Sequence, residues 1–180
     1  MDALTRSLLD LSQLEAHDSV IQYKDMDLAA LLREFAEPFA SRAEQAELIF
    51  DLDIVTEPIK IKGDKAQLST LIQNLLDNAI KFTPPGGQVN VILSEQNDAA
   101  RLRVTDTGIG IPEDDVPHLF SRFHRGRNAS AYPGSGLGLA IVKTIADQHG
   151  ASIRVESDST GTVFVLYMTP VRKISESLDA

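Results

Sequence analysis

The sequence contains no cysteine and no long apolar run. Without cysteine the chain can form no disulfide, no thiolate metal site and no cysteine nucleophile, which is typical of a reducing compartment. The longest apolar run that we find, Val163 to Met168, is far shorter than the roughly 20 residues of a membrane-spanning helix. The first residues include Asp2 and lack the apolar stretch of a signal peptide. We therefore expect a soluble, cytoplasmic, untargeted chain.

Positive charge is also scarce, with 17 Lys+Arg against 26 Asp+Glu and a net charge of −9. General nucleic-acid binding depends on Lys and Arg that neutralise phosphates, so we expect no nucleic-acid partner. Any phosphate site must be a local feature of the chain. A hydrophobic content of 43% over 180 residues is enough apolar material for one packed domain.

The periodicity of apolar residues predicts a mixed α/β domain. Helical spacing is present in residues 1–16, 28–47, 64–82 and 137–149, with Asp27 and Asp64 as N-caps and with a kink or break at Pro38. Strands are expected at 20–24, 48–54, 59–62, 88–95, 101–106, 151–156 and 162–168. The longest strands are joined as hairpins, which predicts a sheet of about five strands with helices on one face. Residues 107–136 form a long loop, and loops of this length are usually functional or disordered.

The predicted helix over residues 64–82 carries the first chemical motif. Asn74 and Asn78 are four residues apart and so share one face of the helix, and Lys81 and Phe82 follow them. An amide oxygen can ligate a hard divalent cation, and a lysine can contact phosphate. By itself the asparagine pair equally fits ordinary polar contacts on the flank of a helix.

The second motif lies where a predicted strand runs into the long loop, at Asp106-Thr107-Gly108-Ile109-Gly110-Ile111-Pro112. A carboxylate at a strand end can accept a hydrogen bond from an exocyclic amine such as that of adenine, and glycines allow close approach of a ligand to the backbone. The alternative is a tight turn in which the glycines serve only the backbone geometry.

The third motif, Gly134-Ser135-Gly136-Leu137-Gly138-Leu139, opens a predicted helix whose free N–H groups form an anion site. It is not the dinucleotide fingerprint, because Leu139 stands where that pattern needs a glycine. Upstream, residues 121–130 hold Arg122, Arg125 and Arg127 and no acidic residue. A triphosphate is a natural counter-charge for this stretch, although a solvated loop is the alternative.

Together and in their order along the chain, the three motifs and the intervening Phe120-Ser121-Arg122-Phe123-His124-Arg125 resemble the N, G1, F and G2 boxes of sensor histidine kinases. The resemblance covers residues 64–168 and places the chain in the superfamily that includes gyrase, Hsp90 and MutL. It implies a two-layer Bergerat-type α/β sandwich, with ATP held under a mobile lid. It also implies three segments: 1–18 as the end of a dimerisation helix, 19–170 as the catalytic ATP-binding domain and 171–180 as a polar tail.

The resemblance also implies roles for individual residues. Asp106 would recognise the adenine amine with help from Thr162, and Asn78 would bind Mg²⁺ with support from Asn74. Lys81 and Arg125 would meet phosphate during transfer, and Phe82 would line the nucleotide pocket. The remaining positions would contact the nucleotide or the phosphates through backbone: Gly108, Gly110, Gly134, Gly136, Leu137 and Gly138.

One departure from the family is informative. The family's phosphoacceptor stretch, His-Glu/Asp-x-x-Arg-x-Pro, does not occur in the sequence. We therefore expect the acceptor histidine on a separate dimerisation domain of a homodimeric parent kinase, with a response regulator downstream. Whether that parent is membrane-anchored is left open by the sequence. Asn74 replaces the Glu that activates water in the hydrolytic relatives, which favours phosphoryl transfer over hydrolysis. Two alternatives are a serine kinase of the anti-sigma-factor type and a non-catalytic, nucleotide-gated interaction module.

Overall fold

The computed structural model describes residues 21–171 and, before them, the single residues Thr5, Leu8, Leu9 and Ser12. Those four residues are helical, as predicted for residues 1–16, and Leu8 and Leu9 are about half exposed. Leu4, Leu11 and Leu14 of the predicted stripe lie outside the described residues, and so does the tail after Val171. The predicted boundaries of the three segments therefore remain predictions.

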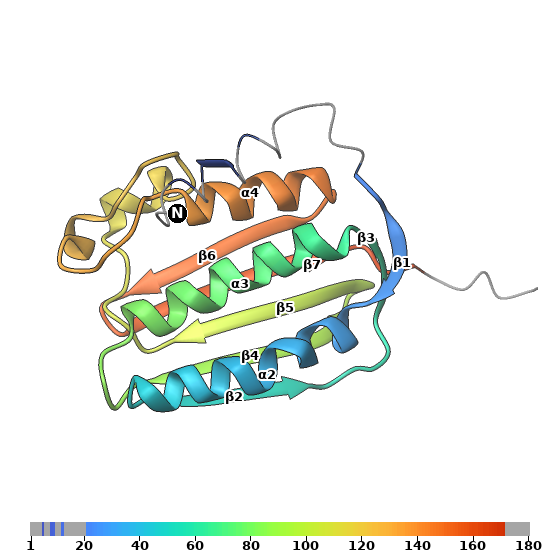
Figure 1. Ribbon diagram of the computed structural model, residues 1–180, viewed down its shortest axis with the longest axis horizontal. Helices are drawn as coiled ribbons and strands as arrows, with labels where there is room; N and C mark the ends of the chain where they lie inside the picture. The colour runs from blue at the N-terminus through green and yellow to red at the C-terminus, as the bar shows by residue number, and fades with distance from the viewer. Residues whose placement is uncertain (1–4, 6–7, 10–11, 13–20, 172–180) are drawn as a thin grey trace, which may run out of the picture.

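The described chain forms two layers, a five-stranded sheet and three helices that cover one of its faces (Figure 1). The elements are β1 (Lys24–Asp27), α2 (Leu28–Gln45), β2 (Ile49–Ile54), β3 (Lys60–Gly63), α3 (Lys65–Phe82), β4 (Gln88–Gln96), β5 (Ala99–Asp106), the 3₁₀ turns η1 (Glu113–His118) and η2 (Arg127–Ala129), α4 (Gly138–Gln148), β6 (Ser152–Asp158) and β7 (Gly161–Met168). The strand order is β2-β4-β5-β7-β6. Only the β2–β4 pair is parallel, so the predicted mixed, largely antiparallel sheet is confirmed.

Strand alternation explains why the helices cover one face only. Along β4, Val89, Val91 and Leu93 are buried, whereas the residues between them are half-buried. Strand β5 repeats this alternation. A strand with one apolar side packs that side against a second layer and leaves the other side to solvent.

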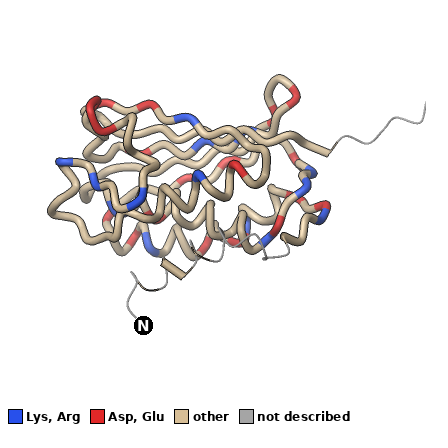
Figure 2. The backbone as a smooth tube through the Cα atoms, turned by 90° about the horizontal axis from the view of Figure 1, so that it is seen from above, with Lys and Arg blue, Asp and Glu red and all other residues tan. Residues whose placement is uncertain are grey.

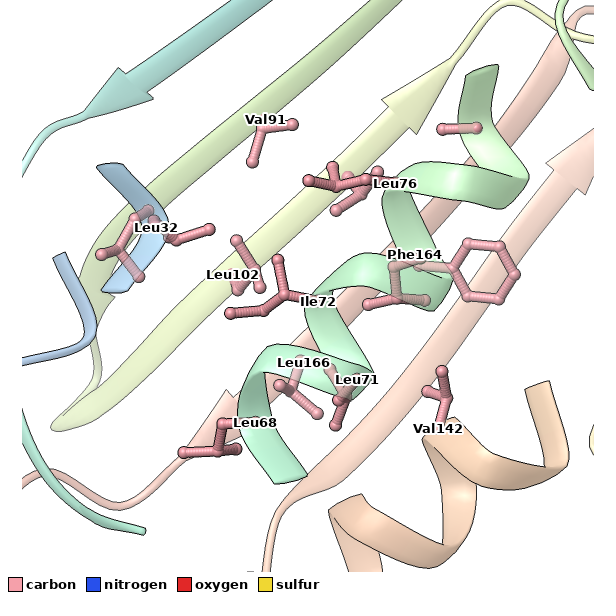
Figure 3. Packing of buried hydrophobic residues seen from close by; sticks show 14 of the residues in the cluster. Leu32, Leu68, Leu71, Ile72, Leu76, Val91, Leu102, Val142, Phe164 and Leu166 are labelled. Atoms are coloured by element: carbon pink, nitrogen blue, oxygen red, sulfur yellow. The ribbon is translucent and has the colours of Figure 1, made fainter. Parts of the chain in front are cut away.

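The core lies between the sheet and α3, the central helix of the covering layer (Figure 3). Leu68, Leu71, Ile72 and Leu76 project from α3 toward the sheet and are at most 1% exposed. Side chains from both neighbouring helices and from the sheet complete the packing: Leu32, Val142, Leu102, Phe164 and Leu166. The buried leucines hold α3 in a fixed rotation about its axis, because a helix can present only one apolar stripe to the sheet.

Both predicted N-caps are confirmed. The carboxylate of Asp27 accepts a hydrogen bond from the N–H of Ala29 at 3.1 Å. Asp64 Oδ1 accepts from the N–H groups of Ala66 and Gln67 at 2.9 and 3.1 Å. These bonds satisfy donors that have no partner inside the helix and so fix where α2 and α3 begin.

One local prediction is wrong, and of the two alternatives predicted at Pro38, a kink or a break, the break is excluded. The first strand is β1 at Lys24–Asp27 rather than 20–24, because it pairs antiparallel with β3 in a separate two-stranded sheet. Helix α2 is not broken at Pro38 and continues to Gln45. Pro38 is exposed, and Phe39 and Ala43 beyond it are buried, so packing on the core outweighs the lost backbone hydrogen bond.

We expect Leu71→Ala to lower the free energy of unfolding by about 2 to 5 kcal/mol, because it removes a fully buried side chain at the centre of the α3 stripe. Urea denaturation followed by circular dichroism measures this change. Val55→Ala is the control, since Val55 is 64% exposed and its loss should change stability by less than about 0.5 kcal/mol. Equal losses in both variants would contradict the assignment of the core.

Candidate functional site

A cavity of about 630 Å³ lies between α3, the start of α4 and residues 107–137, which we call the lid. Most of the predicted site residues line it, namely Asn74, Asn78, Lys81, Phe82, Gly110, Arg125, Gly134, Gly136 and Gly138. Four others do not line it: Asp106, Gly108, Leu137 and Thr162. The structure thus brings the separate motifs of the sequence together around one space.

Helix α3 presents its polar edge to this cavity because its leucine stripe faces the sheet. Asn74 Nδ2 donates to the carbonyl of Thr70 at 2.8 Å, which leaves the amide oxygen free to face α4. A Cβ added to Gly138 would lie 2.7 Å from Asn74 Oδ1, so only glycine allows the two helices this approach. Asn74 therefore helps to seat the first turn of α4 beside the cavity.

Asn78 and Asp77 also line the cavity. Asp77, which the sequence motifs did not single out, forms an ion pair with Arg42 of α2, with 2.5 Å between Nη1 and Oδ1. No group of three or more His, Cys, Asp or Glu side chains suited to a metal occurs among residues that the structure describes. One amide oxygen fits Mg²⁺ only when phosphate oxygens and water supply the other ligands, as is usual for this ion.

Lys81 lies at the mouth of the cavity, with Nζ 4.2 Å from the centre of the Phe82 ring. Burial lowers the pKa of Lys81, and the positive charge of Arg125 lowers it further. The Phe82 ring in turn packs against Tyr132 of the lid at 5.2 Å between centroids. Tyr132, absent from the predicted site, therefore joins the lid to the end of α3.

Polar side chains of the lid brace it internally. Asn128 Nδ2 donates to the carbonyls of Ile109 and Gly110 at 3.2 and 3.0 Å. Buried Asp115 accepts from the N–H of Arg127 at 2.9 Å. Irregular segments lack a periodic pattern, so nothing in the sequence marked Asn128 or Asp115 as structural.

The lid contains the three arginines singled out from the sequence, and Figure 2 shows blue segments, which mark Lys and Arg, in the loops at the left end of the molecule. Arg125 lines the cavity, but its guanidinium donates from Nη2 to the carbonyl of Ala129 at 2.9 Å and to that of Tyr132. Arg127 is paired with Asp114. Arg125 would thus have to exchange these carbonyls for a phosphate in order to act in transfer.

Asp106 ends β5 behind the cavity wall and is 7% exposed. Its Oδ1 accepts from the N–H groups of Gly108 and Thr162 at 2.9 and 3.3 Å. Burial raises the pKa of Asp106 to about 6, against the opposing effect of these two donors. The side chain is thus ionised at neutral pH. Its Oδ2 atom accepts no hydrogen bond from any residue in the described part of the chain.

Glycine is required at two of the predicted positions. Gly110 has φ +65°, and a Cβ there would lie 1.7 Å from the carbonyl oxygen of Asp158. Gly136 has φ +74° and would bring a Cβ within 2.7 Å of the backbone of Phe123 and His124. The lid and the loop after β5 therefore pass too close to their neighbours for any side chain.

Leu137 is 0% exposed and belongs to the core, so its side chain cannot contact a nucleotide in this conformation. Its backbone is the N-cap of α4, and no side chain caps that position. The free N–H groups of the first turn, next to Gly136 and Gly138, remain available to an anion. The predicted phosphate site is accordingly a backbone site.

His149 is the C-cap residue of α4. Its Nδ1 lies 2.8 Å from the carbonyl of Ile145, and its Nε2 accepts from the N–H of Asp64 at 3.0 Å. Burial lowers the pKa of His149, which favours the neutral ring that this bond requires. A second histidine, His124 of the lid, lines the cavity.

This fold and this cavity define a class, an α/β sandwich with a cavity between its central helix and a lid. A family model described as histidine kinase-, DNA gyrase B- and HSP90-like ATPase matches residues 63–172. The chain belongs to this family. It is a histidine-kinase-type, ATP-binding catalytic domain.

Individual relatives agree with this assignment. The chain is 41% identical over 162 residues to the signal transduction histidine-protein kinase/phosphatase MprB of Mycobacterium sp. (strain KMS), covering 89% of this chain and 30% of the relative. The solved mycobacterial sensor histidine kinase MprB is 33% identical, with a TM-score of 0.75 and coverage of 83% of this chain and 100% of that one. Full-length ShkA, solved in complex with AMPPNP, is 26% identical, with a TM-score of 0.81 and coverage of 94% and 36%.

The chain thus spans about a third of the length of the curated relatives it matches. Within the described residues, no helix is both long and apolar enough to cross a membrane.

We expect Asp106→Asn to stabilise the ligand-free domain near neutral pH. The raised pKa means that the folded state binds this proton more tightly than the unfolded chain, so ionisation destabilises the fold as pH rises from about 4 to about 6. Asparagine keeps the Oδ1 acceptor without the charge, and should raise the free energy of unfolding at about pH 7.5 by about 1 to 3 kcal/mol. Urea denaturation at about pH 7.5 and about pH 5 measures the gain, which should shrink at the lower pH. An equal change at both pH values would contradict a buried, ionised Asp106.

Proposed function

We propose that this domain binds Mg-ATP in the cavity and transfers the γ-phosphate to a histidine on a dimerisation domain of its parent kinase. The observation that carries the proposal is the convergence of Asn78, Lys81, Arg125 and the first turn of α4 on one cavity. In a chain of net charge −9, such a concentration of phosphate-binding groups needs an anionic ligand.

Residues at the end of β5 would recognise the base. The ionised Oδ2 of Asp106 can accept a hydrogen bond from an exocyclic amine, and Thr162, beside it in β7, can hold a bridging water. Gly110 lines the cavity and Gly108 donates its N–H to Asp106, so both would allow the loop backbone to approach the base. Phe82, which also lines the cavity, would contact the nucleotide. This arrangement fits adenine, which offers an amine at its Watson–Crick edge.

The phosphates would lie between α3 and the first turn of α4. Lys81 supplies a point charge there, and the N–H groups after Leu137 supply directed donors. Asn78 would hold Mg²⁺ together with the phosphate oxygens, and Asn74 would keep the neighbouring helix start in place. Mg²⁺, when bound, neutralises charge on the β- and γ-phosphates.

In the transfer step a nitrogen of the acceptor imidazole forms a bond to the γ-phosphorus. The bond from that phosphorus to the β–γ bridging oxygen breaks, ADP leaves with the electron pair, and the imidazole proton passes to solvent. Arg125 would release the carbonyls of Ala129 and Tyr132 to approach the γ-phosphate. Asn74 cannot act as a base toward water, which favours transfer over hydrolysis.

The partners follow from this chemistry. The acceptor would be the histidine-containing dimerisation domain of a homodimeric parent, and a response regulator would take the phosphate from it. The names of the relatives support this assignment, since MprB is described as a histidine-protein kinase and phosphatase of signal transduction.

We expect the purified domain to bind ATP in the presence of Mg²⁺ and to phosphorylate a separately supplied dimerisation domain. The product should lose its phosphate in acid, as phosphohistidine does. An acid-stable phosphoserine would support the serine-kinase alternative, and nucleotide binding without transfer to any supplied dimerisation domain would support a gated interaction module. Radiolabelled ATP with acid and base treatment of the product distinguishes these outcomes.

We expect Asn78→Ala to weaken Mg-ATP binding by about tenfold to a hundredfold, because it removes the only amide ligand expected for the cation. ADP without Mg²⁺ should bind the variant and the wild type alike. Gln73→Ala is the matched control, since Gln73 lies on the same helix, is exposed and does not line the cavity. Calorimetric titration measures these affinities, and an unchanged Mg-ATP affinity in Asn78→Ala would contradict the assigned role.

A further inference from the structure

The Ser157 hydroxyl lies where three segments of the nucleotide site meet. It donates to the carbonyl of Gly161 at 2.8 Å, at the start of β7. It accepts from the N–H of Ile111 at 2.9 Å, in the loop that follows Asp106. Its oxygen is also 3.0 Å from Thr162 Oγ1, directly across the β6–β7 pair. Ser157 was not among the residues that the sequence motifs identified.

Counting protons fixes the direction of the third bond. A serine hydroxyl has one proton and two lone pairs. The Gly161 carbonyl can only accept, so it takes the Ser157 proton, and the Ile111 N–H can only donate, so it occupies one lone pair. The remaining lone pair must accept the proton of Thr162. The Thr162 oxygen is therefore left with lone pairs and no proton for any other partner.

Asp106 and Thr162 together then form an acceptor-only pair. They face each other in the register of β5 and β7, and the Thr162 N–H already donates to Asp106 Oδ1. Asp106 is 7% exposed and Thr162 is 5% exposed, so bulk water does not supply alternative donors freely. A nucleotide base at this position must therefore supply the hydrogen-bond donor for Asp106 and Thr162.

We propose that Ser157 is a positioning residue that makes the base site selective for adenine over guanine. The inference rests on the nucleotide site proposed above. Adenine has an exocyclic amine where guanine has a carbonyl oxygen, so adenine supplies the missing donor and guanine adds a further acceptor. A site whose polar groups cannot be satisfied by the wrong ligand rejects that ligand strongly.

Removing the Ser157 hydroxyl would free the Thr162 hydroxyl to rotate. Thr162 could then donate to a guanine carbonyl, and it would no longer be held as an acceptor for the adenine amine or for a bridging water. The loss of the hydrogen bond from the Ile111 N–H would act differently, because a loosened loop weakens the binding of ATP and of GTP to the same extent. The ratio of the two affinities therefore separates a specificity role from a purely structural one.

The experiment measures ATP and GTP affinity, both with Mg²⁺, by calorimetric titration of the wild type and of Ser157→Ala, Thr162→Val and the double variant. We expect Ser157→Ala to reduce the ATP-to-GTP affinity ratio by about tenfold, the value of one hydrogen bond. Ser157→Thr retains a hydroxyl and should keep the wild-type ratio within about twofold. In the Thr162→Val background, Ser157→Ala should change the ratio no further, since Ser157 acts through Thr162.

Either of two results would overturn the inference. The first is an unchanged ATP-to-GTP affinity ratio in Ser157→Ala, and the second is an effect of Ser157→Ala on this ratio that persists in the Thr162→Val background. If a thermal melt shows that Ser157→Ala does not fold, Thr162→Ser and Thr162→Val test the same hydrogen bond from its other end. The ATP-to-GTP affinity ratio should be unchanged in Thr162→Ser and lower in Thr162→Val. An unchanged ratio in both variants overturns the inference. A wild-type domain that binds neither nucleotide contradicts the proposed function itself, whereas one that prefers ATP equally in all variants contradicts only the role of Ser157.

Discussion

The packing of α3 on the sheet is the constraint on which the rest of the site depends. Because Leu71 and Leu75 are buried in the core, the polar edge beside this stripe carries Asn74 and Asn78 toward the lid. The last turn then places Lys81 and Phe82 in the lining of the cavity. A helix that rotated or slid on the sheet would move all four polar and aromatic groups together, so the hydrophobic stripe sets the geometry of the chemistry.

The lid depends on α3 in turn, but through weaker contacts. Tyr132 packs on Phe82, and the N–H of Ile109 donates to the carbonyl of Phe82 at 3.0 Å. These are a few aromatic and polar contacts rather than a core, and segments with few buried contacts open at low free-energy cost. The guanidinium of Arg125 donates to the carbonyls of Ala129 and Tyr132 within the lid, so the charge proposed to act in transfer also braces the lid when phosphate is not bound.

Much of the fold could be predicted from sequence because it follows from short-range chemistry. Asp27 and Asp64 mark helix starts, and the alternation around Val89 and Val91 marks a strand with one buried side. The motif residues of α3 also fell where the helical period placed them. The alternative of a helix break at Pro38 failed because burial of side chains further along α2 outweighs the backbone hydrogen bond lost at proline. No local sequence pattern reveals this burial.

The residues missed at the site share a different property. Asp77, Asn128, Tyr132 and Ser157 act through partners that are distant in sequence, such as Arg42 for Asp77 and Ile111 for Ser157. Polar side chains of this kind are common on any surface, so residue type and spacing alone do not distinguish them. Leu137 shows the converse, since the glycine-rich motif around it suggested ligand contact and the structure buries its side chain in the core.

The proposed base site keeps its acceptors short of donors because Asp106 is buried. Two backbone N–H groups hold one carboxylate oxygen in place without satisfying the other, and the desolvation that remains raises the pKa of Asp106. An incoming amine that donates to the free oxygen recovers part of that cost. Both Asp106 and Thr162 are held by neighbouring strands and by the loop at Ile111, so they need no reorganisation when the base arrives. Preorganised, under-satisfied acceptors turn a small instability of the free domain into selectivity for the ligand.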